Sequence, residues 1–348
     1  MPRPGCSLTT LVAAIIAILL VLAALVMQRG SDPRALSGFG PKPGAAAGFG
    51  PKHGGAAARE VQWGQPAPFP QELLAEGLRF VRGRVRASRG FGPASAADRA
   101  LFAAEARRLS RRYGVPVRGE QLVAVRDMEV ALEARTGGVR ALRHGPEILA
   151  ASRGGEAVLA IAERLRLPPM AALRQLLLEG GHSPAAVRAL VADPAALPRR
   201  LAAEVPAIFE ADLGSRLNAE RIRARSQAFE DALEGHLRRQ GLRFRTEEDL
   251  RRAPDGRAPR LTPDFLLDEP VRINGEMVSW IDAKDYPMYG GRLVAQNLIR
   301  QAVKYTEAFG PGAMVFSGGL MGGGLAPLPK GLPRPLFLDG SALMPEPI

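Results

Sequence analysis

One segment of the chain, residues 242–317, constrains its fold more than any other. Short runs of strand-forming residues follow an amphipathic helix expected at Leu213–Gln240. The dipeptide Asn274-Gly275 separates two of these runs, and Asn-Gly is the strongest short-range signal for a β-hairpin. A second helix is expected at Arg292–Ala308. This order predicts an α/β domain with a central mixed sheet flanked by helices. The expected strands are Leu242–Arg245, Pro263–Leu267, Val271–Ile273, Met277–Ala283, Ala313–Ser317 and Pro335–Leu338.

We place the α/β domain at 201–348. The residues before it, 67–200, predict an all-helical region. Apolar residues recur there at helical spacing between Gly and Pro breaks. Within it, 156–180 predicts two helices joined at Leu167-Pro168, with a proline starting the second helix. Such a pair could be a helix-turn-helix that presents Arg174 and Gln175 outward to DNA. The alternative is a pair that only packs into a helical core.

The beginning of the chain predicts three further segments. A basic N-terminus at 1–7 precedes an apolar segment at 8–28, in which the twenty residues 8–27 carry no charge. That length suffices to cross a bilayer and exceeds the apolar region of most signal peptides, so we expect a membrane anchor, with an organelle-targeting signal as the alternative. Residues 29–66 follow as a flexible linker rich in Gly, Ala and Pro.

Composition narrows the chemistry that the chain can perform. A single Cys and four His exclude an intrachain disulfide and argue against a zinc site, which leaves carboxylates as the ligands for any metal. The net charge of +12 favours a polyanionic partner such as nucleic acid. A GC-rich coding bias explains the arginine excess equally well, because only five of the 47 basic residues are Lys.

The residues that carry chemistry lie on the expected hairpin. Asp264 stands at the start of a strand, and Asp282 and Lys284 lie two residues apart on another. Because side chains alternate along a strand, we expect Asp282 and Lys284 on an exposed face and Ile281 and Ala283 in the core. Two converging aspartates suit a hard divalent cation, and a lysine beside them can hold a water or a phosphate oxygen. The plain alternative is a solvated strand face with an ion pair.

These residues resemble a known signature. Pro263-Asp264, followed eighteen residues later by Asp282-Ala283-Lys284, is similar to the PD-(D/E)XK nuclease signature. The segments LTPDF, VRINGEMVSWIDAK, RQAVKYTEAFGPG and LPPMAALRQLLLEG resemble the codanin-interacting nuclease family over about residues 140–320. The resemblance implies a restriction-endonuclease-like core at 201–348. The apolar segment and the linker have no counterpart in it.

The resemblance assigns roles to individual residues. Asp264 and Asp282 match metal ligands, and Lys284 matches the lysine that positions or activates water. A Glu from the first core helix completes the set, with Glu230 as the first choice and Glu234 as the second. Two helix residues four positions apart, Gln301 and Tyr305, match polar contacts to the substrate, although packing on a helix explains them as well.

The implied activity is hydrolysis of phosphodiester bonds with Mg2+ or Mn2+, on DNA in preference to RNA. A codanin-like protein is a further implied partner. The alternative is a non-catalytic scaffold that uses the same fold to bind such a partner. By the resemblance the protein is nuclear or cytoplasmic, whereas the apolar segment 8–27 indicates membrane anchoring or organelle targeting.

Overall fold

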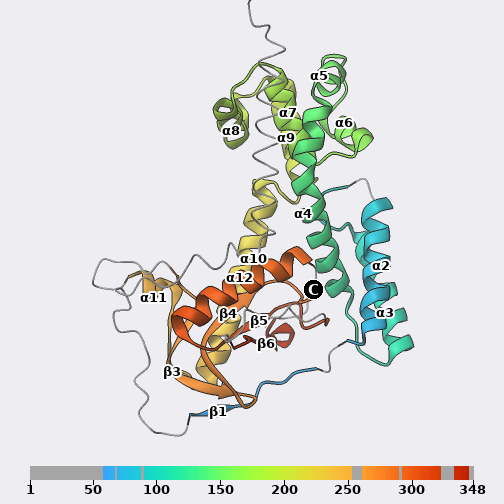
Figure 1. The fold of residues 1–348 in the computed structure, drawn as a ribbon. Helices are drawn as coiled ribbons and strands as arrows, with labels where there is room; N and C mark the ends of the chain where they lie inside the picture. The colour runs from blue at the N-terminus through green and yellow to red at the C-terminus, as the bar shows by residue number, and fades with distance from the viewer. Residues whose placement is uncertain are drawn as a thin grey trace, which may run out of the picture. The chain divides into compact units, whose positions relative to one another are not determined.

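A computed structural model describes residues 58–66, 69–87, 90–252, 261–289, 292–322 and 333–344. The described residues form a mixed α/β structure in which a helical region lies in the chain between the first strand of a six-stranded sheet and the other five. Figure 1 labels the elements. The helices of the first region are α2 (Gln71–Ala87), α3 (Ala96–Tyr113), α4 (Gly119–Arg143), α5 (Gly145–Arg153), α6 (Val158–Leu165), α7 (Pro169–Glu179), α8 (Pro184–Ala192) and α9 (Arg199–Glu210).

The helical region has two hydrophobic cores. One joins α2, α3 and α4 to Tyr289 and Met321, which follow strands of the sheet. The other joins the end of α4 to α5–α9. Val205 and Ile208 of α9 belong to this second core, so the helical region reaches beyond the expected boundary at residue 200.

The predicted DNA-reading helix is buried. Its position as α7 agrees with the expected Pro169 start, but α7 packs against α4, α5, α6, α8 and α9. Gln175, which we expected to point outward, is only 6% exposed, and its Nε2 donates a hydrogen bond of 2.8 Å to Oε1 of Glu179. Arg174 is exposed. A helix surrounded on most sides cannot enter a DNA groove, so the packing alternative holds for this pair.

The sheet follows with its own helices. Its strands run in the order β1-β3-β4-β5-β6, with β2 beside β3. The pairs β2/β3 and β3/β4 are antiparallel, whereas β1/β3, β4/β5 and β5/β6 are parallel. The elements are β1 (Glu60–Val61), α10 (Arg216–Arg239), β2 (Phe244–Thr246), α11 (Glu247–Arg251), β3 (Phe265–Ile273), β4 (Glu276–Lys284), α12 (Arg292–Phe309), β5 (Gly312–Phe316), β6 (Leu336–Asp339) and the 3-10 turn η3 (Ser341–Leu343).

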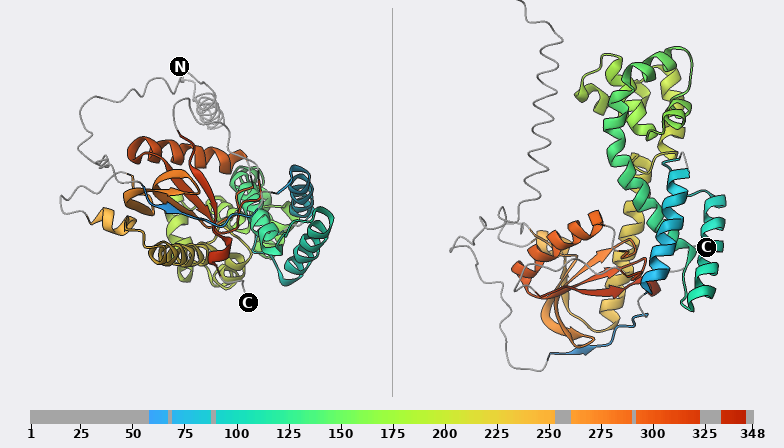
Figure 2. Two further views of the ribbon diagram at one scale, coloured as in Figure 1. Left: turned by 90° about the horizontal axis from the view of Figure 1, so that it is seen from below. Right: turned by 45° about the vertical axis from the view of Figure 1, so that its right-hand side comes forward.

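Helices α10 and α12 cover opposite faces of the sheet, as Figure 2 shows. Phe229 of α10 packs with Ile281 of β4, while Ala302 of α12 packs with Trp280 of the same strand. Successive residues of β4 therefore point into two different cores. Because both faces are covered, a charged side chain on the central strands is buried whichever way it points.

The predicted hairpin is confirmed. Asn274 and Gly275 join β3 to β4 with φ angles of 50° and 85°, the positive values that a tight hairpin turn of this kind requires. The two strands expected at 263–267 and 271–273 are one strand, β3, whose register against β4 shifts between Leu266 and Val271. Pro270, which has no amide hydrogen to donate, lies in this irregular stretch.

The end of the expected linker is ordered. Within 29–66, β1 pairs with β3, and Trp63 is buried while its indole Nε1 donates a hydrogen bond of 2.8 Å to the carbonyl of Asp339. Val61 and Trp63 bury apolar surface in the core of the sheet. Residues 29–57 lie outside the described residues.

The expectation of a transmembrane helix needs correcting. In the part of the chain that the structure describes, no helix combines the length and the apolar character needed to cross a bilayer. The segment 8–28 lies outside that part.

Candidate active site

The tripeptide Thr262-Pro263-Asp264 leads into β3 and lies against the end of β4. The amide of Ala283 donates a hydrogen bond of 2.7 Å to Oδ2 of Asp264. Phe265 and Ile281 are antiparallel partners, so one step further along the ladder brings Asp264 opposite Asp282. Directly opposed residues of an antiparallel pair point to the same face. The two aspartates that we expected to converge therefore share one side of the sheet.

Asp282 and Lys284 form an ion pair inside the protein. The Nζ of Lys284 contacts Oδ2 of Asp282, whose side chain is only 3% exposed, against 14% for Lys284. The expectation of an exposed Asp-Lys face is therefore wrong, because α12 covers this side of the sheet. The predicted alternation itself is confirmed, since Ile281 and Ala283 contribute to the core on the α10 side.

Glu230 lies on α10, which covers the other face of the sheet, and its charge still acts on Asp264. It follows the buried Phe229 and is partly buried itself. Among the described residues its carboxylate has no hydrogen-bond or ion-pair partner. The second choice, Glu234, instead pairs with Arg238 one turn further along α10. Of the two, only Glu230 is close enough to raise the pKa of Asp264 by its charge.

The carboxyl groups of this cluster perturb one another. Burial and then the charge of Asp282 raise the pKa of Asp264 to about 7. Burial also raises the pKa of Asp282, against the opposing effect of Lys284. For Glu230, burial and then the charges of Glu247, Asp231 and Asp282 raise the pKa. The site thus holds more negative charge than its one lysine compensates.

This donor set fits a hard divalent cation in charge and in ligand type. Carboxylate oxygens are the ligands that Mg2+ and Mn2+ prefer, and a cation would offset both the burial and the mutual repulsion that raise the pKa values of these groups. Asp264, Asp282 and Glu230 would hold it. In the described part of the chain, no three His, Cys, Asp or Glu side chains already stand close enough together to hold a metal. The oxygens of Asp282 are occupied by Lys284 and Gln301.

Gln301 and Tyr305 hold the site together from α12. Gln301 donates hydrogen bonds through Nε2 to Oδ1 of Asp282 at 3.1 Å and to the hydroxyl of Tyr305 at 3.2 Å. The Tyr305 hydroxyl in turn donates to the carbonyl of Thr262 at 2.9 Å. Burial raises the pKa of Tyr305 to about 12, so its hydroxyl stays protonated as a donor. Gln301 thus contacts Asp282 directly, and Tyr305 contacts the backbone two residues before Asp264. The expected contact of both residues with substrate stays a prediction.

Two acidic residues of the site were missed at the level of sequence. Glu247, the first residue of α11, accepts a hydrogen bond of 2.7 Å from the Thr262 hydroxyl, and its amide donates to the carbonyl of Asp264 at 3.1 Å. Its charge raises the pKa of Glu230. The sequence did carry a signal for this helix. Thr246 and Asp249 form the capping box that marks a helix start directly after the strand expected at 242–245.

The second missed residue is Asp285, directly after Lys284. Its carboxylate accepts hydrogen bonds from Arg225 Nε at 2.7 Å and Ser226 Oγ at 3.2 Å, both on α10, and from Ser317 Oγ at 2.9 Å after β5. It therefore ties the helix that carries Glu230 to the end of the Asp-Ala-Lys strand. Sequence offers no signal for this, because the partners are about 60 and about 32 residues away.

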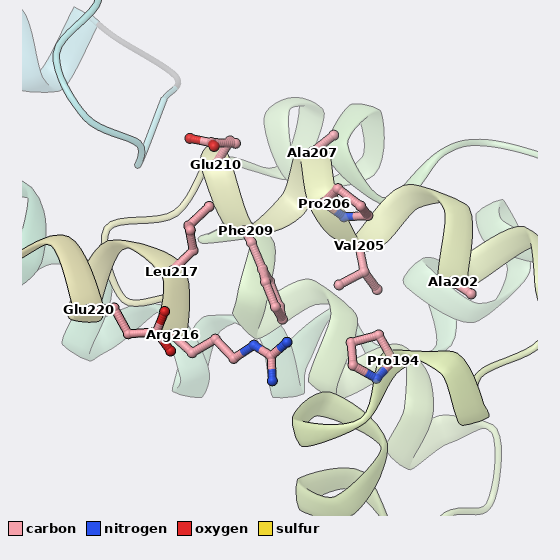
Figure 3. A pocket seen from close by; sticks show the side chains of 10 residues that line it. All are labelled: Pro194, Ala202, Val205, Pro206, Ala207, Phe209, Glu210, Arg216, Leu217 and Glu220. Atoms are coloured by element: carbon pink, nitrogen blue, oxygen red, sulfur yellow. The ribbon is translucent and has the colours of Figure 1, made fainter.

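A pocket lies elsewhere in the described structure. It has a volume of about 650 Å³ and lies between the 3-10 turn η2 (Pro194–Ala196), α9 and the start of α10. Figure 3 shows the side chains that line it. Arg216 crosses the ring of Phe209 there, with its guanidinium carbon 5.4 Å from the ring centroid. The lining holds two glutamates, Glu210 and Glu220, and none of the residues assigned to the active site. It is a separate feature of the helical region.

Comparison with known proteins finds one matching family. A protein family described as "Protein of unknown function TPD sequence-motif" matches residues 197–323. That range begins before α10, ends after β5 and contains the Thr262-Pro263-Asp264 tripeptide. The similarity thus covers α10, strands β2 to β5, α12 and all candidate site residues, while β1 and β6 lie outside it.

The chain is also similar to a curated viral protein, the uncharacterized protein L539 of Acanthamoeba polyphaga mimivirus. The two are 40% identical over 123 residues, which is 34% of this chain and 42% of the viral protein. The chain therefore spans less than half of that relative. No solved structure matches the chain.

Proposed function

We propose that this protein is a metal-dependent nuclease that hydrolyses phosphodiester bonds of DNA, of the kind that the PD-(D/E)XK signature implies and resembling the codanin-interacting nuclease. The observation that carries the proposal is the convergence of Asp264, Asp282 and Lys284 at the ends of β3 and β4. A charged pair in a doubly covered strand is costly to bury, and it needs a functional reason.

The arrangement of elements supports the proposal. Helix α10, the strands β2, β3 and β4, helix α12 and strand β5 follow one another in the chain, and the mixed sheet lies between the two helices. This agrees with the restriction-endonuclease-like core that the signature implies. The acidic residues lie where the antiparallel pair β3/β4 meets the parallel strand β5.

The residues of the chain divide the proposed reaction between them. Asp264, Asp282 and Glu230 would hold the divalent cation, which when bound would activate a water and offset charge on the phosphate. Lys284 moves from its pair with Asp282 to an oxygen of the attacking water or of the phosphate. Gln301 keeps Asp282 oriented, and Tyr305 keeps the Thr262 carbonyl, and with it Asp264, in place.

The test is a cleavage assay on purified protein. Labelled single-stranded and duplex DNA, and RNA for comparison, are incubated with Mg2+ or Mn2+ and with a chelator. We expect a product that the chelator abolishes. Lys284→Ala should abolish that product while binding of DNA is largely kept, and Lys304→Ala, an exposed lysine on α12, is the matched control.

Two results would count against the proposal. Chelator-resistant cleavage, or cleavage by Lys284→Ala at the rate of the unaltered protein, would remove these residues from the chemistry. A protein that binds DNA or a codanin-like partner but yields no product on any substrate would instead be the scaffold that shares this fold.

A further inference from the structure

The middle of α10 is unusually exposed for a helix that joins two cores. The helix packs on α9 at its start and on β4 and η3 further along. Its buried residues are Asn218, Phe229, Leu233 and Leu237, so about three turns between the first two face solvent. Figure 1 shows α10 continuing past the sheet toward α9. This exposed stretch leads directly to Glu230.

The exposed stretch leaves an apolar side chain uncovered. Ile222 lies seven residues before Phe229 and therefore on nearly the same side of the helix, the side that packs on the sheet. It is nevertheless 44% exposed. The core-facing side of α10 thus extends past the end of β4 with nothing from the described residues covering it.

The same exposed stretch carries two charged residues, Glu220 and Arg223, that form no ion pair within the described residues. Arg221 pairs with Glu210 at 2.6 Å, and Arg225 pairs with Asp285 at 2.7 Å. Arg223 is exposed and has no acidic partner within the described ranges. Arg223 differs from the arginines on either side of it, Arg221 and Arg225, which are both paired. The acidic site begins two turns further along the helix, at Glu230.

Helix geometry aligns Arg223 with the proposed metal ligand. Seven residues separate Arg223 from Glu230, which places them about 20° apart around the axis and about 10.5 Å apart along it. Ser226, between them, donates to Asp285 at the end of β4. Arg223 therefore flanks the acidic site. Its distance from Glu230 along the helix equals the length of about three nucleotides in a duplex strand, or of fewer nucleotides in an extended strand.

We infer that the exposed stretch of α10 is the track on which the substrate strand lies, with Arg223 binding a backbone phosphate close to the scissile one and Ile222 contacting a base or sugar. This inference rests on the proposed nuclease function for the meaning of the site. Guanidinium groups bind phosphate through paired hydrogen bonds, and a phosphate contact orients a strand without reading its sequence.

The experiment measures DNA binding separately from cleavage. Binding of a fluorescent single-stranded DNA oligonucleotide to the full chain is followed in Ca2+ over a range of salt concentrations. Arg223→Gln should weaken binding about three- to tenfold and lower the slope of log affinity against log salt by about 1. The control is Arg239→Gln, an exposed arginine on the same helix but about 160° away around the axis, which should change neither quantity.

A second arm locates the contact on the DNA. Single phosphates on either side of the cleavage position are replaced in turn by neutral methylphosphonates. One such replacement, within about three nucleotides on one side, should weaken binding by the unaltered protein and have no effect on Arg223→Gln. Equal losses with both proteins at every position would overturn the inference, as would unchanged binding by Arg223→Gln.

The two proposals fail separately. If the protein cleaves DNA and Arg223→Gln binds DNA normally, the nuclease proposal stands and the proposed substrate track on α10 is wrong. If the protein does not cleave DNA but Arg223→Gln loses one phosphate contact, the track stands and the nuclease proposal is wrong. Absence of both binding and cleavage overturns both.

Discussion

The amide of Ala283 donates a hydrogen bond of 2.7 Å to Oδ2 of Asp264. The middle residue of the Asp-Ala-Lys segment thus positions the aspartate of the Thr-Pro-Asp tripeptide through its backbone alone. Its side chain faces the core on the other side of the sheet. This contact explains how two short motifs, eighteen residues apart, form one site. Because the donor is a backbone amide, the contact does not depend on the side chain between Asp282 and Lys284.

Asp264→Asn should stabilise the metal-free protein at alkaline pH and remove the response to metal. The asparagine oxygen can still accept the hydrogen bond from Ala283, while the buried negative charge is lost. We expect a gain on the order of 2–4 kcal/mol in the free energy of unfolding with chelator at about pH 8, since each pKa unit is worth ~1.4 kcal/mol. Urea unfolding with chelator and with Mg2+ measures both effects.

The matched control for this variant is Asp268→Asn, an exposed aspartate on the same strand. It should shift stability by less than ~0.5 kcal/mol and keep the stabilisation by Mg2+. A stabilisation by Mg2+ that survives in Asp264→Asn would show that this carboxylate does not hold the ion.

The stability of the metal-free protein should fall as the pH rises from about 4 to about 7. Burial and the charge of Asp282 raise the pKa of Asp264 from 3.8 to about 7, so the folded protein keeps a proton that the unfolded chain has lost. The free energy of unfolding declines wherever the folded state binds more protons. Mg2+ should flatten this decline, because the cation takes the place of the proton. Thermal unfolding across this range tests it, and a rising stability without metal would contradict the raised pKa.

Lys284→Met should destabilise the protein as well as stop cleavage. Removing one partner of a buried ion pair leaves the other charge uncompensated, which costs about 3–5 kcal/mol. Adding Asp282→Asn should recover most of that stability without restoring cleavage. Urea unfolding of the single and double variants measures the pair, with Lys304→Met as the exposed-lysine control. If Lys284→Met is as stable as the unaltered protein, the Asp282–Lys284 ion pair is accessible to water and not buried.

Tyr305→Phe should slow cleavage, because it removes the hydrogen bond from the Tyr305 hydroxyl to the carbonyl of Thr262. The variant leaves the Thr262 carbonyl and the Gln301 amide without their partner, at a cost of about 1 kcal/mol. Displacement of the neighbouring Asp264 should lower kcat about ten- to a hundredfold while KM changes little.

The control for that hydroxyl is the next residue. The Thr306 hydroxyl is buried and accepts or donates no hydrogen bond within the described structure. Thr306→Val should therefore keep both stability and kcat. If Tyr305→Phe raises KM and leaves kcat unchanged, the hydroxyl contacts the substrate directly, as the resemblance implies.

Removal of residues 1–57 should leave the fold stable, whereas removal of residues 1–66 should not. The second truncation deletes β1 and the buried Trp63, and loss of one buried Trp alone costs about 3–5 kcal/mol. Comparing urea midpoints of the two truncated proteins measures this difference. Equal midpoints would show that the ordered strand at 60–61 contributes little.

The kinds of elements in the sheet region could be predicted because their signals are local. The Asn274-Gly275 turn, the helical spacing in α10 and α12 and the strand runs are properties of neighbouring residues. The same holds for α7, whose start at Pro169 follows from proline chemistry. The candidate residues Asp264, Asp282 and Lys284 were also identifiable, since their spacing is a motif.

Burial and mutual contact could not be predicted, because they depend on chain segments far away. The sequence by itself determined the hairpin, the helices and the identity of the acid-acid-lysine set. Only the tertiary structure decided that α12 buries Asp282, that α10 offers Glu230 in preference to Glu234, and that Asp285 ties that helix to β4. A side chain's surroundings are set by whichever distant element packs over it, and no local pattern encodes that choice.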